Sequence, residues 1–174
     1  MRQLFFLIAL VHTTLSYSQD IFVFTEDGLY PEYAISKIDG LSQNKLYNKT
    51  LGWVYKTYKN PNVVISSKSE NHFIFLTSLE ENVINADKRV FHMRYTIKIS
   101  FNNEQFKFEP IKIQFKANSK YDMGWKDFDL KNGAIFFKKG KVIKKTKSYV
   151  IDVPKVLNKL NTNLHNYLTA EVSN

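Results

Sequence analysis

The sequence predicts an α+β domain, built as a mostly antiparallel sheet of four to six strands with two helices packed on one face. Two segments with apolar residues at helical spacing, 42–59 and 153–168, enclose a run of segments in which apolar and polar residues alternate. Strands that follow one another directly pair antiparallel, and helices at both ends of the run can cover one face of the sheet. The other face is expected to stay at least partly open.

The first 18 residues have the three-part layout of a secretory signal peptide. A basic residue, an apolar run and two small residues supply its parts: Arg2, residues 4–11, Ser16 and Ser18. The apolar run is too short to cross a bilayer, which needs about 20 residues. The sequence therefore predicts export, with cleavage near Ser18-Gln19, to the periplasm or out of the cell. The alternative is a buried strand or helix at the start of the fold.

Residues 19–174 are expected to form a single domain, without an internal repeat or a low-complexity linker. The chain is 44% hydrophobic and 15% aromatic, which is typical of a folded domain with a real core. It has no cysteine, so packing alone must hold it together, and thiol catalysis, cysteine-based zinc sites and a lipid-bearing cysteine are excluded. No later segment is long and apolar enough to span a membrane, so the mature chain is expected to be soluble.

Ahead of the first helix, residues 19–30 predict a lead-in strand or extended arm with a turn at Asp27-Gly28, and residues 33–38 predict a strand. In the segment 42–59 the apolar positions form one stripe: Leu46, Tyr47, Thr50, Leu51, Val54, Tyr55 and Tyr58. Ser42 suits the N-cap, with Leu41 packed on Leu46 as a hydrophobic staple. Asn60-Pro61 is expected to end the helix.

Four strands are predicted after that helix: residues 62–67, 72–79, 91–101 and 106–116. The third alternates most cleanly and is joined to the fourth by a tight turn at Asn102-Asn103. In the fourth strand the alternation changes phase at Glu109-Pro110, which indicates a bulge or an edge position.

The last part of the chain gives weaker signals until its final helix. Residues 122–131 predict a turn of helix or a loop, and residues 134–143 predict a small hairpin turning at Lys139-Gly140. A stripe of apolar residues over 153–168 predicts the amphipathic C-terminal helix, with Asp152 as its N-cap.

The segment 24–78 resembles an exported family of Bacteroidetes that has no assigned function and a fold like that of the TATA-binding protein. The matching positions are Leu46, Tyr47, Leu51, Trp53, Thr57, Tyr58, Lys59, Pro61, Val64 and Ile65. The resemblance implies a β-α-β-β-β-β-α domain in a bacterial envelope, and it implies no activity. Residues 118–150 depart from the family pattern, which indicates an altered edge or a lysine-rich insertion.

The sequence contains no pattern that predicts catalysis. His72, His92 and His165 lack metal-ligand spacing. Three pairs of carboxylates fall in predicted loops, where they are expected to be solvated: Glu26/Asp27, Glu80/Glu81 and Asp127/Asp129. No nucleophile elbow or phosphate-binding glycine loop is present. We therefore expect no catalytic residue, no metal and no cofactor.

Two groups of basic residues predict a binding surface on a chain of formal charge +9. The first is a lysine-rich hairpin at 131–147, which can instead protect a sheet edge from aggregation. The second is a strip formed on the open sheet face by two neighbouring strands, which can instead be an ordinary solvated face. Together they give the candidate surface: Arg94, Lys98, Lys112, Lys116, Lys138, Lys139, Lys141, Lys144 and Lys145.

The function expected from the sequence is that of an exported, non-enzymatic binding or accessory domain. Its partner would be an envelope protein or an anionic glycan or lipid, and export makes nucleic acid the least expected partner. The alternatives are an envelope enzyme, such as a hydrolase, with an unrecognised site, and a structural subunit whose open face is filled by a partner.

Overall fold

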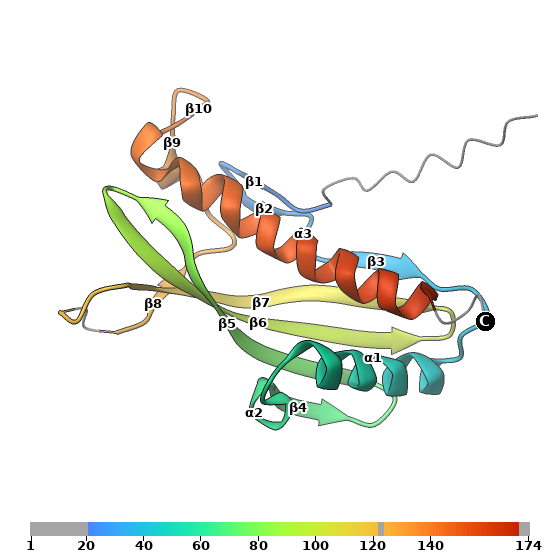
Figure 1. The fold of residues 1–174 in the computed structure, drawn as a ribbon. Coiled ribbons are helices and arrows are strands. Elements are labelled where there is room, and N and C mark those ends of the chain that lie inside the picture. The colour runs from blue at the N-terminus through green and yellow to red at the C-terminus, as the bar shows by residue number, and fades with distance from the viewer. Residues whose placement is uncertain (1–20, 122–123, 171–174) are drawn as a thin grey trace, which may run out of the picture.

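The computed structural model describes residues 21–121 and 124–170, so the predicted signal segment and its cleavage site lie outside the described residues. Its centre is a six-stranded sheet in which all neighbouring strands pair antiparallel (Figure 1). The order across the sheet is β3, β7, β6, β5, β4, and β8 pairs with the end of β7. The strands are β3 Ala34–Lys37, β4 Ile65–Ser69, β5 Phe73–Ala86, β6 Arg89–Asn102, β7 Gln105–Ala117 and β8 Lys126–Phe128.

Two long helices, α1 (Gln43–Thr57) and α3 (Lys147–Ala170), pack on one face of this sheet (Figure 1). The alternation of β6 decides which face they cover. Met93, Tyr95 and every second residue after them are buried, and the intervening residues are half-buried on the opposite face. The core therefore lies between sheet and helices, and the predicted α+β architecture is confirmed.

The first helix follows the sequence prediction at both ends. The Ser42 Oγ accepts a hydrogen bond from the Lys45 N–H at 3.4 Å, and Leu46 and Val54 are fully buried. The helix α1 ends at Thr57, shortly before Asn60-Pro61, and Pro61 begins a helical turn, α2 (Pro61–Val64), so the predicted strand 62–67 was wrong in its first half. Proline at the first helical position has the right φ angle and no N–H to leave unpaired, which explains the turn.

The lead-in segment is a two-stranded hairpin of its own, β1 (Val23–Thr25) and β2 (Gly28–Tyr30). Gly28 has a φ of +106°, and a Cβ there would lie 2.3 Å from the carbonyl oxygen of Leu130. The N–H of the next residue, Leu29, donates to that same oxygen at 2.8 Å. The turn predicted at Asp27-Gly28 is confirmed, and it docks on the loop after β8.

The phase change in β7 is a bulge. Ile97 faces Pro110 and Thr96 faces Lys112, so Ile111 is the extra residue. The edge alternative also holds locally, because β3 pairs with β7 only up to Phe108 and β8 only from Ile113, which leaves residues 109–112 without a strand partner on that side among the described residues. Two of the carboxylate pairs also differ from prediction: Glu80 and Glu81 lie within β5, and Asp127 lies within β8.

The region 124–150 contains more structure than its sequence indicates. It includes β8 in place of the predicted helical turn or loop, and then short elements: η1 Ala134–Phe136, β9 Phe137–Lys138, β10 Lys141–Val142 and η2 Lys144–Thr146. The predicted hairpin is confirmed, with positive φ at both Lys139 and Gly140, as its tight turn requires. The predicted N-cap was wrong: α3 begins at Lys147, and Asp152 lies inside it and accepts from the Ser148 hydroxyl.

Candidate functional site: the open face of the sheet

The face of the sheet opposite the helices brings the predicted basic strip together. On β6 the side chains of Arg94 and Lys98 share this face, because they alternate with the buried positions. The register then places Lys112 beside Thr96 and Lys116 beside His92. All four predicted strip residues therefore lie on two adjacent strands, in neighbouring rows.

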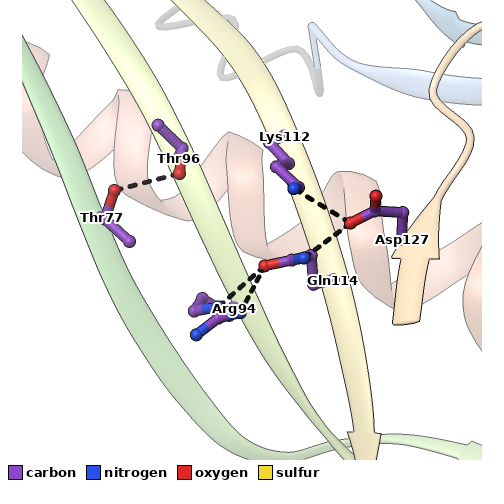
Figure 2. Close-up of polar contacts among 6 residues, drawn as sticks. All are labelled: Thr77, Arg94, Thr96, Lys112, Gln114 and Asp127. Atoms are coloured by element: carbon purple, nitrogen blue, oxygen red, sulfur yellow. Dashed lines mark hydrogen bonds and ion pairs between the residues drawn. The ribbon is translucent and has the colours of Figure 1, made fainter. Parts of the chain in front are cut away.

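A chain of polar contacts crosses this face from β6 to β8 (Figure 2). The Arg94 guanidinium donates from Nε and Nη2 to the Gln114 Oε1, at 2.9 and 2.6 Å. The Gln114 Nε2 donates to the Asp127 Oδ1 at 2.6 Å, and the Lys112 Nζ lies 3.2 Å from the same oxygen. Hydrogen bonds from Gln114 and Lys112 lower the pKa of Asp127, so this carboxylate stays ionised and fixes two of the strip residues.

Aromatic rings accompany the cations on the same face. The Arg94 guanidinium carbon lies 4.4 Å from the centre of the Trp125 ring, and the Lys98 Nζ lies 5.4 and 5.7 Å from the rings of Phe73 and Phe75. Contacts of this length are attractive because the ring face is electron-rich. They hold flexible basic side chains against the sheet and reduce the conformational entropy that is lost when a partner binds.

One more basic residue, Lys107, extends the strip toward β3. The Lys107 Nζ lies 4.7 Å from the centre of the Tyr33 ring and 2.8 Å from the Glu109 Oε2. Lys107 faces Ser100 across the β6–β7 ladder, so it lies in the row next to that of Lys98 and Glu109. We call this surface the open face, defined by its cations and rings: Arg94, Lys98, Lys107, Lys112, Lys116, Tyr33, Phe73, Phe75 and Trp125.

Sequence reasoning missed the rings of this surface and found the cations. The alternation within 72–79 already put Phe73 and Phe75 on one side of a strand. What it did not give was the register, which sets Phe75 directly beside Lys98. Trp125 offered no signal, because the residues around it have neither helical nor strand periodicity.

The lysines of the predicted hairpin form a separate patch. Lys138 and Lys141 face each other on β9 and β10, which form their own two-stranded sheet beside the start of α3 (Figure 1). Lys139, Lys144 and Lys145 are exposed on the same projection. The nine residues predicted as one surface therefore divide into the open face and this hairpin.

Two histidines near the sheet lie apart from each other, and two tyrosine hydroxyls pair in the core. His72 and His92 lie near opposite ends of the β5–β6 pair, since Phe73 faces Ser100 and Glu80 faces Met93. Residues 21–121 and 124–170 contain no cluster of three or more metal-ligating side chains. The Tyr58 and Tyr95 hydroxyls lie 3.0 Å apart, and burial raises the pKa of both. They serve as a hydrogen-bonded pair in the core.

Comparison with known proteins gives the family. Residues 33–116, which run from the start of β3 to the end of β7, match the model of a domain of unknown function, DUF4468, with TBP-like fold. These residues belong to the DUF4468 family. The resemblance seen over 24–78 in the sequence is therefore confirmed, and β1, β2, β8 and α3 lie outside the matched segment.

Two crystal structures have the same fold as this chain. A TBP-like protein from Parabacteroides distasonis matches with a TM-score of 0.60 and 16% identity, over 78% of this chain and 90% of the other. A DUF4468 family protein from Bacteroides ovatus matches with a TM-score of 0.61 and 13% identity, over 78% and 84%. No curated protein sequence matches. Among the described helices, none is long and apolar enough to cross a membrane.

Proposed function

We propose that this chain is an exported, non-enzymatic binding module of the bacterial envelope, which holds an anionic partner on its open face. The layout of residues 1–18 supports export. The observation that carries the binding role is the combination of rows of cations with aromatic rings on one exposed side of a rigid sheet.

The sheet explains why this surface suits a polymer or an extended partner. Long antiparallel strands keep the cations in fixed rows, and two of them are also tied to Asp127 directly or through Gln114. Fixed charges attract an anionic partner at little entropic cost, and the rings add apolar contact for sugar rings or side chains.

Titration calorimetry on the full chain tests this proposal. The anionic ligand is dextran sulfate, and neutral dextran is its uncharged control. We expect saturable binding of dextran sulfate alone, weakening steeply as salt rises, because exposed charges are screened over about 8 Å at physiological salt. The double variant Lys98→Gln, Lys116→Gln should weaken binding about tenfold, since it removes two charges from the strip. It leaves the contacts of Arg94, Gln114 and Asp127 in place.

The matched control is Lys138→Gln, Lys141→Gln, which removes the same charge from the hairpin. We expect its affinity for dextran sulfate to stay close to that of the unmodified chain. Equal losses in both variants would show that total charge, and no particular face, drives binding. Absence of binding at low salt would refute an anionic partner altogether.

Export has its own test. When the full chain is expressed in a bacterium with a secretion system, the protein in the periplasm or medium should begin at Gln19, as read by mass spectrometry of its N-terminal peptide. Replacing two apolar residues of the run, Leu7→Lys and Leu10→Lys, should abolish processing, because the run must partition into lipid. Recovery of the uncleaved protein in the cytoplasm from the unmodified gene would contradict export.

A further inference from the structure

An aromatic cleft lies on the other side of the sheet from the open face, near the end where β8 pairs with β7. Its floor consists of the rings of Phe91 and Phe115 from the sheet, Phe128 from β8, Phe136 from η1 and Tyr149 from α3. Phe115 shares the helix side of β7 with Ile113, so the rings of the cleft lie on the opposite side of the sheet from the cations of the open face, and Asp127 borders both.

The rings form one continuous apolar wall around Tyr149. Its ring centre lies 5.0 Å from that of Phe115, 5.5 Å from that of Phe136 and 6.0 Å from that of Phe128. The cleft beside them has a volume of about 680 Å³. This is within the range of pockets for small organic molecules, which are mostly apolar with a few polar groups that fix orientation.

Three polar groups at the cleft can fix the orientation of a bound molecule: the side chains of Arg89, Lys126 and Tyr149. Arg89 and Lys126 line it, and within the described parts of the chain neither forms an ion pair. The Arg89 guanidinium lies 5.5 Å from the centre of the Phe91 ring, so it borders the apolar wall directly. The Tyr149 hydroxyl has no hydrogen-bond partner among residues 21–121 and 124–170, and burial raises its pKa, so it remains a neutral donor.

Three carboxylates lie at or near the cleft. Asp127 is held toward the open face by Gln114 and Lys112, and Lys112 balances its charge. Asp129 accepts a hydrogen bond from the N–H of Lys131 at 2.8 Å. Asp87 lies near Tyr149 and contributes one further negative charge. Lys112 offsets Asp127, and Asp129 and Asp87 equal Arg89 and Lys126 in number, so direct contact with Arg89 and Lys126, and not net charge, suits the cleft to a single anionic group.

We propose that the aromatic cleft binds a small aromatic carboxylate, with its ring against Phe115, Phe136 and Tyr149 and its carboxylate between Arg89 and Lys126. The aromatic side chains of the cleft favour an aromatic ligand, because tilted and edge-to-face ring contacts add interaction energy to that of the buried apolar area. A carboxylate suits a guanidinium and a phenol, which both donate hydrogen bonds to it.

The test uses 2-naphthoate and its uncharged match, 2-naphthalenemethanol, with the full chain and titration calorimetry. We expect saturable binding of both, with 2-naphthoate about tenfold tighter, because charge-assisted hydrogen bonds exceed neutral ones. In the variant Arg89→Gln, Lys126→Gln the two probes should bind equally, at the level of the alcohol. The hairpin variant Lys138→Gln, Lys141→Gln should keep the tenfold preference.

Each other outcome overturns the inference. If 2-naphthoate fails to saturate, the cleft is not a site for this class. If the preference for the carboxylate survives in Arg89→Gln, Lys126→Gln, or is lost equally in the hairpin variant, the assigned groups do not hold it. Circular dichroism and thermal melts of both variants establish that they are folded. Since dextran sulfate tests a different face, either proposal can fail alone.

Discussion

Single residues show where this fold places polar groups that the sequence does not mark. Tyr58, at the end of α1, and Tyr95, in the middle of β6, are far apart in the chain but meet hydroxyl to hydroxyl at 3.0 Å. Burial raises the pKa of both, and for Tyr58 the neighbouring Tyr95 raises it further. A buried phenol that cannot ionise in the folded state has consequences for stability at high pH.

The free energy of unfolding should fall as pH rises above about 10, the usual pKa of tyrosine in an unfolded chain. Both phenols keep their protons when folded and release them when unfolded, so stability present below that pH is lost above it. In Tyr58→Phe the decline should be shallower, because one fewer group ionises on unfolding. Urea denaturation at pH 7, 9 and 10.5 measures this, and Tyr121→Phe, at an exposed position, is the control. Equal slopes in all three proteins would contradict it.

At the scale of elements, one side chain fastens the start of the fold to its last helix. Asn158, on the buried side of α3, accepts from the Phe22 N–H at 2.8 Å and donates to the Phe22 carbonyl at 2.9 Å. The Phe22 backbone thus forms two hydrogen bonds outside any sheet, as buried polar groups require. The hairpin β1–β2 therefore depends on α3, although the two are at opposite ends of the chain.

Asn158→Ala should reduce the free energy of unfolding by about 1–3 kcal/mol, because it leaves a buried N–H and C=O without partners. Hydrogen exchange should then increase first at Phe22 and through β1. The control is Asn166→Ala on the exposed side of the same helix, which should change stability by less than about 0.5 kcal/mol. Similar losses from both substitutions would show that the effect comes from helix propensity and not from the contact.

At the scale of the whole molecule, charge and core occupy different parts of the fold. The core is a single layer between sheet and helices. The hairpin lysines project beside the start of α3 on a separate two-stranded sheet (Figure 1). A projection of this kind can lose its charge without disturbing the core, because its lysine side chains are exposed.

Replacing Lys138, Lys141, Lys144 and Lys145 with Ser should leave the fold intact, with a melting temperature within about 2 °C of the unmodified chain. The contrasting variant is Leu46→Ala, at a fully buried position of α1, which should cost about 2–5 kcal/mol. Thermal melts followed by circular dichroism compare the two. Loss of a cooperative transition in the lysine variant would show that the hairpin is part of the folding unit.

The sequence by itself determined the class of the fold and most of its elements. Hydrophobic periodicity and turn residues are local properties of the sequence. They therefore predicted five features: α1, β6, the β7 bulge, the Lys139-Gly140 turn and the apolar stripe of α3. The basic strip was also predicted from the sequence, because alternation on β6 and β7 decides which side chains share a face.

Only the tertiary structure decided which residues meet. Three contacts join segments that lie far apart in the chain or have no periodicity. They are the Trp125 ring on Arg94, the Asp127 carboxylate on Lys112 and the Asn158 amide on Phe22. Their pairing depends on strand register and on where helices dock, which are set by packing of the whole core and not by any local pattern. The aromatic cleft arises in the same way, where β6, β7, β8, η1 and α3 converge.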